Sequence, residues 1–81
     1  MRLDKYLKVT RIIKRRTVAN EACDAAHVTV NGRPAKASSD VKVGDLIDVT
    51  FGARTLRIRV LEIRETVGKD AASSLYEVVE E

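Results

Sequence analysis

Cationic side chains are concentrated at the start of this 81-residue chain. Residues 1–16 contain seven lysines and arginines and one acid, a net charge of +6, whereas the other 65 residues carry a net charge of −3. The seven cations are Arg2, Lys5, Lys8, Arg11, Lys14, Arg15 and Arg16. Like charges placed so close together repel one another, and phosphate groups commonly relieve that repulsion. The pattern predicts a polyanionic ligand, with nucleic acid favoured over an anionic membrane.

Some of the chain's cations have a simpler explanation. Taken singly, five of them are more typical of a solvated surface that keeps a protein soluble: Lys5, Lys8, Lys42, Lys69 and Arg64. The run at residues 14–16 differs because it stands where two predicted helices meet. Free backbone amides at the start of the second helix would also attract phosphate there. We therefore expect the ligand at this junction.

Groups that could perform catalysis are sparse. The only cysteine and the only histidine are Cys23 and His27, for which a buried thiol and a solvated turn residue are the expected roles. These two residues are too few for a structural zinc site. The carboxylates of the second half are scattered through turns, and the glycines are isolated rather than grouped in a phosphate-binding loop. The sequence predicts no enzyme activity, no metal and no cofactor.

Length and composition predict one domain over residues 1–81. Hydrophobic residues make up 44% of the chain, with one proline and four glycines, so the chain can form a core and is not of low complexity. No apolar stretch is long enough to span a bilayer, and the first residues lack the apolar segment of a secretory signal. A single cysteine excludes an internal disulfide. We expect a cytoplasmic monomer that does not bind membranes.

Two helices are predicted before any strand. Leu3, Tyr6, Leu7 and Thr10 recur at helical spacing, and Asp4 stands in the first turn, where its carboxylate can accept backbone amides or hold Arg2. A second helix is expected over residues 18–25, with Thr17 as its N-cap. Its apolar stripe is predicted to be Val18, Ala19, Ala22, Cys23 and Ala26, and its solvated side Asn20, Glu21 and Asp24.

The period of the pattern then changes to two, which indicates strands. A strand over residues 28–30 leads into an Asn31-Gly32 turn, and residues 33–36 continue as a short or edge strand. Further strands are expected over 46–51, over 56–60 with an extension to 63, and over 75–79. Arg57 and Arg59 are predicted to share a solvated strand face. Two helices followed by four or five strands make an α+β domain.

Four short motifs in this order resemble the S4 RNA-binding domain family. They are Arg2-Leu3-Asp4-Lys5-Tyr6-Leu7, Arg16-Thr17-x-Ala19, Val28-x-Val30-Asn31-Gly32 and Val41-x-x-Gly44-Asp45. The resemblance implies an S4-type αL motif, with two N-terminal helices packed on a small, mostly antiparallel sheet, and it implies binding to structured RNA. The family usually has glycine where Ala26 stands. Either Ala26 bears about 1 kcal/mol of backbone strain or the helix ends in another way.

The resemblance also implies which residues contact RNA. Arg2 and Arg16 are implied to be the central contacts, because a guanidinium binds phosphate in bidentate fashion and stacks on bases. Asp4 and Thr17 would support them. The full set of implied contacts is Arg2, Lys14, Arg15, Arg16, Asn31, Lys36, Ser38, Ser39 and Lys42.

Longer stretches, over residues 2–9, 11–17 and 31–42, resemble small stand-alone proteins of bacterial ribosome-associated quality control, the RqcP group, and more distantly heat-shock protein 15. This resemblance implies a non-enzymatic factor that binds an obstructed large ribosomal subunit carrying peptidyl-tRNA. It would contact 23S rRNA and tRNA and support RqcH as that factor adds alanines to the stalled chain. The alternatives are a heat-shock protein 15-like factor that recycles free large subunits with nascent chain-tRNA, and a protein-interaction module.

Overall fold

The computed structural model describes residues 1–68 and 70–79. Helices α1 (Leu3–Val9) and α2 (Arg16–Asp24) come first. They are followed by strands β1 (Val28–Val30), β2 (Arg33–Pro34), β3 (Leu46–Phe51) and β4 (Arg54–Val60), then by the 3₁₀-helix η1 (Ala72–Leu75) and strand β5 (Tyr76–Val78). The predicted order of two helices and about five strands is confirmed. No helix within these described residues has the length and apolar character needed to cross a membrane.

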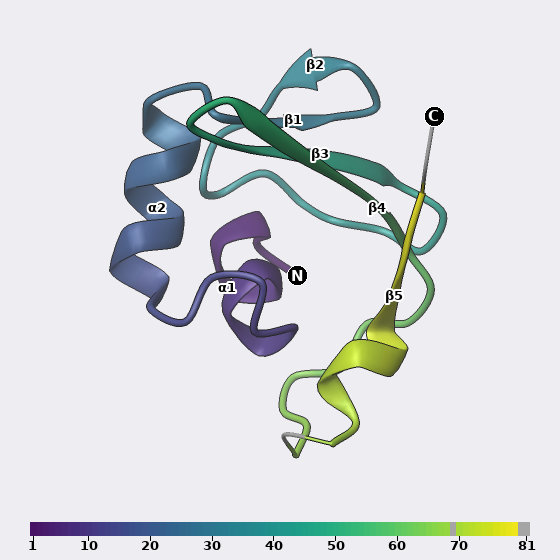
Figure 1. The fold of residues 1–81 in the computed structure, drawn as a ribbon. Coiled ribbons are helices and arrows are strands. Elements are labelled where there is room, and N and C mark those ends of the chain that lie inside the picture. Colours follow the sequence, from purple (N-terminus) through teal and green to yellow (C-terminus); the bar gives the residue numbers. More distant parts are fainter. Residues whose placement is uncertain (69, 80–81) are drawn as a thin grey trace.

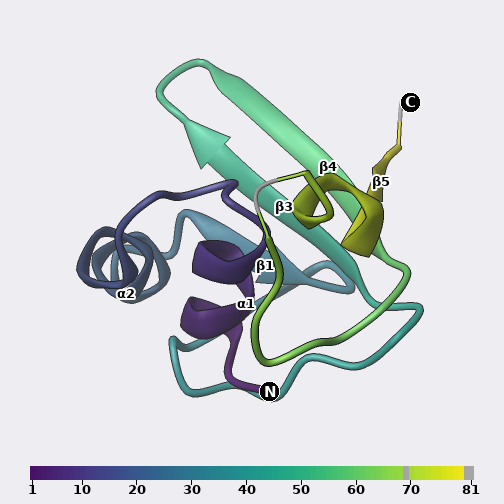
Figure 2. The same cartoon turned by 90° about the horizontal axis from the view of Figure 1, so that it is seen from below.

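The strands form one antiparallel sheet in the order β2-β1-β3-β4-β5. The β3–β4 hairpin is its longest pairing, with Ile47 opposite Ile58 and Phe51 opposite Arg54. Between β1 and β2, Asn31 and Gly32 have φ values of 54° and 81°, which a tight hairpin turn of the Asn-Gly kind requires. Both helices lie on the same side of this sheet (Figures 1 and 2).

The hydrophobic core lies between the helices and the sheet. Helix α1 contributes Leu3, Tyr6 and Leu7, all fully buried, and α2 contributes Ala19 and Cys23. Alternate residues of β3 and β4 meet them from the sheet: Ile47, Val49, Ile58 and Val60. The apolar face predicted for the first helix is therefore confirmed.

The hydroxyl of Tyr6 connects α1 to the C-terminal part of the chain. It donates a hydrogen bond of 2.9 Å to the carbonyl oxygen of Leu75, at the end of η1. Burial raises the pKa of Tyr6 well above its ordinary value, so the hydroxyl keeps its proton for this bond. Tyr6 thus belongs to the core, as its position in the helical stripe predicts.

The predicted start of the second helix is wrong. Helix α2 begins at Arg16, the extended residue Arg15 holds the N-cap position without a side-chain hydrogen bond, and Thr17 lies inside the first turn. A favourable N-cap contributes only about 1 kcal/mol, so Thr17 alone does not decide where the helix begins. Consecutive residues of a helix point about 100° apart, so Val18 points away from the core when Ala19 is buried. Val18 is 47% exposed, and its predicted place in the apolar stripe is wrong.

Two predictions for the C-terminal half also need correction. The chain leaves the sheet at Val60, so Leu61 and Ile63 do not extend β4, and the amide of Leu61 donates instead to the carbonyl of Leu75. Leu75 itself belongs to η1, and the last strand spans Tyr76–Val78. Apolar residues alternate in the same way whether the chain continues as a strand or leaves the sheet as a loop that packs on the same core, so the pattern did not show where β4 ends. The return strand β2 is likewise shorter than predicted, at Arg33–Pro34.

The backbone of Ala26 is strained. Its φ is 61°, in the left-handed region where an alanine Cβ crowds the backbone. The amide of Ala26 donates to Cys23 O at 3.0 Å and that of His27 donates to Ala22 O at 2.9 Å, the pair of bonds of a Schellman motif. Ala26 is exposed and lies beyond the end of α2, so it is not part of the apolar stripe.

Ala26→Gly is expected to stabilise the protein by about 1 kcal/mol, because glycine adopts the left-handed conformation without the Cβ clash. Urea unfolding followed by circular dichroism measures the change. Ala25→Gly is the matched control: Ala25 has a φ of −84°, so glycine there should destabilise the protein. Equal effects of the two substitutions would contradict a strained Ala26.

Candidate nucleic-acid interface

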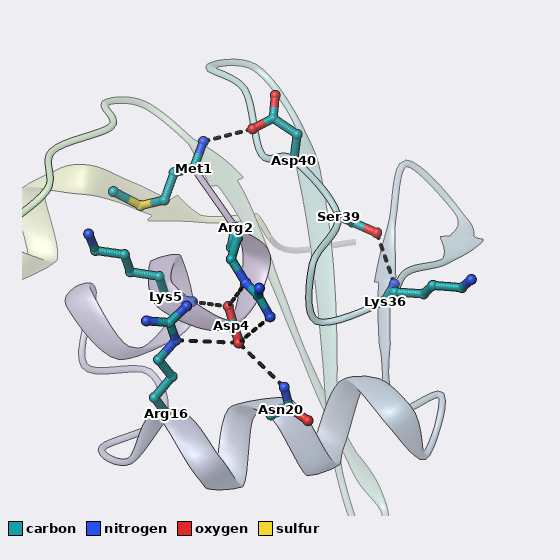
Figure 3. Close-up of polar contacts among 9 residues, drawn as sticks. All are labelled: Met1, Arg2, Asp4, Lys5, Arg16, Asn20, Lys36, Ser39 and Asp40. Carbon is teal, nitrogen blue, oxygen red and sulfur yellow. Dashed lines mark hydrogen bonds and ion pairs between the residues drawn. The ribbon is translucent and has the colours of Figure 1, made fainter.

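The buried carboxylate of Asp4 joins α1 to α2. Its Oδ1 accepts hydrogen bonds from the amide of Lys5 at 2.8 Å and from Nε of Arg2 at 3.2 Å. Its Oδ2 accepts from Nη2 of Arg2 at 3.3 Å and from Nδ2 of Asn20 at 3.5 Å, and it lies 3.4 Å from Nε of Arg16 (Figure 3). Both predicted roles of Asp4, accepting an amide in the first turn and holding Arg2, are confirmed.

This arrangement orients two cations while leaving them accessible. Asp4 is 2% exposed, whereas the side chains of Arg2 and Arg16 are 50% and 46% exposed. Arg16 faces Asp4 through its Nε edge, and a guanidinium has five N–H donors in a planar fork. The remaining donors and the planar faces are available to a phosphate or a base. Asp4 therefore fixes the two arginines rather than neutralising the surface.

Hydrogen bonding controls the charge of Asp4. Burial alone would raise the pKa of this carboxyl, but hydrogen bonds from Arg2, Arg16, Asn20 and the Lys5 amide outweigh burial and hold the pKa below its ordinary value of 3.8. The carboxylate is therefore ionised at neutral pH. A surface hollow of about 490 Å³ opens beside it, lined by Arg2, Asp4, Arg16, Thr17, Asn20 and Glu21.

Acid should destabilise the protein through this carboxylate. A lowered pKa contributes stability that is present above the ordinary value and is lost as the pH falls through the folded-state value. We expect the difference in unfolding free energy between the wild type and Asp4→Asn to shrink as the pH falls below about 4, where Asp4 takes up a proton. Urea unfolding of both proteins across this range measures it, and a difference independent of pH would contradict the role of the charge.

The loop of residues 37–41, between β2 and β3, lies beside Arg2. The amide of Leu3 donates to Ser39 O at 2.8 Å and that of Asp4 donates to Ala37 O at 3.1 Å. The terminal ammonium of Met1 pairs with Asp40 Oδ1 at 2.7 Å (Figure 3). These contacts place residues 37–41 next to Arg2, although more than thirty residues separate the two segments in the chain.

The loop residues implied as RNA contacts have different surroundings. Lys36, Ser38 and Lys42 are exposed. Ser39 Oγ accepts the amide of Lys36 at 2.9 Å, so this hydroxyl closes the turn. Nδ2 of Asn31 donates to Asp45 Oδ1 at 3.2 Å, and Oδ1 of Asn31 accepts from the amide of Leu46 at 3.0 Å. Both polar atoms of this side chain therefore make hydrogen bonds within the protein. RNA contact by this loop stays a prediction.

The cations of the α1–α2 junction are not all at the Asp4 cluster. Arg15 and Lys14 are exposed, and Lys14 lines a separate hollow of about 420 Å³. Arg16 lines both hollows. The structure therefore brings Arg2, Asp4, Arg16 and Thr17 together and leaves Lys14 on the adjoining surface.

Asn20 is a site residue that the sequence reasoning missed. It was predicted on the solvated side of the second helix, but it is half-buried and donates to Asp4. Asn20 follows Arg16 by four residues, so the two side chains share one helix face. That spacing is the signal that could have found it.

Two other expectations concern reactive or charged groups. Cys23 is 3% exposed, and burial, followed by the charges of Asp4 and Asp24, raises the pKa of its thiol to about 11. It is a protonated core residue at neutral pH, as predicted. Arg57 is not simply solvated, because it makes hydrogen bonds of 2.8 and 3.1 Å to the carboxylate of Asp48 across the β3–β4 pair. In the described part of the chain, no group of His, Cys, Asp and Glu side chains could hold a metal ion.

Comparison with known proteins identifies the family of the chain. Residues 1–47 match the family model of the S4 domain. A Streptococcus pneumoniae protein named RQC P-site tRNA stabilizing factor is 51% identical over 81 residues, which span all of this chain and 92% of that protein. The Bacillus subtilis protein of the same name is 48% identical over all of this chain and 94% of its own length.

A solved structure shares the fold. Heat shock protein 15 of Vibrio cholerae, described as a trimer, superposes with a TM-score of 0.90 at 31% identity, over 98% of this chain and 81% of that one. The S4 resemblance noted from the four sequence motifs is thereby confirmed. The chain belongs to the S4 domain family and, within it, to the family of the RQC P-site tRNA stabilizing factors.

Proposed function

We propose that this chain is a non-enzymatic RNA-binding factor of ribosome-associated quality control. It binds obstructed large ribosomal subunits that carry peptidyl-tRNA, contacts 23S rRNA and tRNA, and supports RqcH during alanine tailing of the stalled chain. The observation that carries the proposal is the pair of half-exposed guanidiniums, Arg2 and Arg16, that the buried Asp4 orients. The name shared by relatives about half identical over nearly their whole length supports the ribosomal setting.

The chemistry of the Asp4 cluster suits structured RNA. Two fixed guanidiniums bind adjacent phosphates with little loss of side-chain freedom, and their planar faces stack on unpaired bases. The exposed cations Lys36 and Lys42 extend the positive surface from the loop beside Arg2. Binding of this kind holds an RNA in place and needs no reactive group, which agrees with a protonated and buried Cys23.

Sedimentation of cell extracts tests the proposal. The chain, carrying a small C-terminal tag, should migrate with large subunits that hold peptidyl-tRNA, and its share in those fractions should rise when translation is stalled. The Arg16→Ala variant should remain at the top of the gradient. Arg64→Ala is the control, because Arg64 pairs with the exposed Glu62 and lies outside both hollows. Migration of the wild type with free protein alone, at low salt, would contradict the proposal.

A second candidate is the recycling of free large subunits that hold nascent chain-tRNA. The TM-score of 0.90 against heat shock protein 15 favours it. Mass spectrometry of stalled chains from a deletion strain separates the two functions. Loss of alanine tails supports the quality-control role, whereas unchanged tails with accumulation of occupied free subunits supports recycling.

We propose that the protein acts as a cytoplasmic monomer, since one copy carries the complete Asp4 cluster. Sedimentation velocity should give a mass of 9.0 kDa. A mass three times as large would instead match the trimer described for the Vibrio cholerae protein.

A further inference from the structure

The hollow of about 420 Å³ that adjoins the Asp4 cluster contains Lys14 and Arg16, two of the implied RNA contacts, together with cations that the S4 resemblance does not include. Five cations line it: Lys5, Lys8, Arg11, Lys14 and Arg16. They come from α1, from the loop that follows it and from the first residue of α2, and residues 65–67 also line the hollow. The hollow is therefore a strongly positive groove bordered by a segment distant in the chain.

Most of these charges lack a counter-charge within the fold. Three of the five cations make no ion pair with any side chain of residues 1–68 and 70–79: Lys8, Arg11 and Lys14. Lys5 pairs with Glu65 and Arg16 with Asp4. Unneutralised cations around one hollow raise the local potential and concentrate anions there.

The backbone of Arg11 is strained within this groove. Its φ is 62°, a left-handed conformation that costs a residue with a Cβ roughly 1–2 kcal/mol. The chain reverses there: the amide of Arg11 donates to Lys8 O at 3.0 Å and the amide of Ile13 donates to Leu7 O at 3.1 Å. Glycine would make this turn without strain. Arg11 therefore turns the chain after α1 in a strained conformation and carries its cation at the edge of the groove.

Glu65 is the acidic residue of the groove. Its carboxylate is hydrogen-bonded to the ammonium of Lys5, sixty residues away in the chain, and its side chain is 74% exposed. The segment that carries it lies outside residues 1–47, the part that matches the S4 domain. The Glu65 carboxylate, paired with the Lys5 ammonium, occupies the position that an incoming phosphate oxygen would take.

We propose that this groove binds backbone phosphates of an RNA strand, and that Glu65 holds Lys5 in the free protein and gives way to the RNA. The inference rests on the proposed RNA-binding function and adds a second path for RNA, since Arg16 lines both this groove and the hollow beside Asp4. RNA is the occupant favoured over an acidic peptide because Arg16 lines both this groove and the hollow beside Asp4, where the proposed function already has RNA binding.

The test is fluorescence anisotropy with a fluorescein-labelled RNA stem-loop over a series of salt concentrations. Lys8→Ala combined with Lys14→Ala should weaken binding and lower the slope of log affinity against log salt by about one for each lysine. The control removes the same charge from β4, with Arg54→Ala and Arg59→Ala, which lie outside the groove. Equal slopes for the two double variants would overturn the proposal.

Glu65→Gln tests the competing carboxylate. It should tighten RNA binding by about two- to fivefold, as expected for an exposed ion pair that opposes the ligand. Glu77→Gln, on β5, removes the same charge outside the groove and should leave the affinity nearly unchanged. Unchanged or weaker binding by Glu65→Gln would overturn the part of the proposal that concerns Glu65.

These outcomes are separable from those of the proposed function. If the wild type does not migrate with large subunits but the lysine variants still lower the salt slope on the stem-loop, the groove proposal stands without the ribosomal one. If the wild type migrates with large subunits and the slopes are equal, only the groove proposal fails. Competition by a poly-glutamate peptide stronger than that of unlabelled stem-loop would assign the groove to an acidic peptide and overturn it.

Discussion

Arg16→Ala should weaken RNA binding by about tenfold or more, because an arginine that contacts phosphate or base in bidentate fashion contributes roughly 1–3 kcal/mol. Arg16 has the largest expected effect of any single cation since it lines both hollows. The salt slope should fall by about one. Anisotropy with a labelled RNA stem-loop, repeated with purified large subunits, measures both quantities.

The fold should tolerate this change. Asp4 keeps Arg2, Asn20 and the Lys5 amide as partners when Arg16 is removed, and Arg16 is 46% exposed, so we expect a loss of unfolding free energy below about 1 kcal/mol. Arg64→Ala provides the matched loss of one exposed charge. Arg16→Lys keeps the charge but lacks the planar fork, and it should restore only part of the affinity. An Arg16→Ala protein that unfolds would show that the residue is structural.

Asp4→Asn should weaken RNA binding although it makes the protein more positive. Asparagine keeps one acceptor oxygen but replaces the other with an NH₂ donor and removes the negative charge, so Arg2 and Arg16 are held less firmly and repel each other. We expect a loss of about five- to tenfold in affinity, comparable to losing one oriented arginine. If net charge alone governed binding, the same substitution would tighten it. The sign of the change therefore distinguishes orientation from bulk electrostatics.

The same substitution should also reduce stability. Breaking a buried ion pair by removing one partner costs about 3–5 kcal/mol, and because both arginines here are half-exposed we expect about 2 kcal/mol. Urea unfolding at neutral pH measures this loss and identifies conditions under which the variant is folded for binding. Asp24→Asn, an exposed acid of α2, is the control for charge. Tighter binding by a folded Asp4→Asn protein would contradict the orienting role.

Local patterns in the sequence were sufficient for most of the fold. The alternation in residues 46–51 and the Asn31-Gly32 turn predict β3 and the β1–β2 hairpin, because side-chain period and turn type are set by neighbours in the chain. The spacing of Leu3, Tyr6 and Leu7 likewise predicts the buried face of α1. Each of these signals spans fewer than ten residues.

Features that depend on distant contacts escaped prediction. The amide bonds from residues 3 and 4 to residues 37 and 39, the Lys5–Glu65 pair and the separation of Lys14 from Arg2 have no periodic signal, because they arise only when the helices dock on the sheet. The role of Asn20 likewise depends on a distant contact, because it donates to Asp4 on the other helix. Of the candidate site, the central pair Arg2 and Arg16 and its support by Asp4 were predictable; the grouping of the outer cations was not.

The bond from the Tyr6 hydroxyl to Leu75 has a consequence for truncated forms of this protein. A fragment ending at residue 47, where the S4 match ends, would lack β4 and η1 and would cut β3 after its second residue. It would leave the Tyr6 hydroxyl without its acceptor and would remove Ile58 and Val60 from the core cluster that includes Leu3, Tyr6 and Leu7. The helix that carries Asp4 is therefore held in part by a residue near the opposite end of the chain, and we expect a fragment ending at residue 47 to be less stable than the full chain.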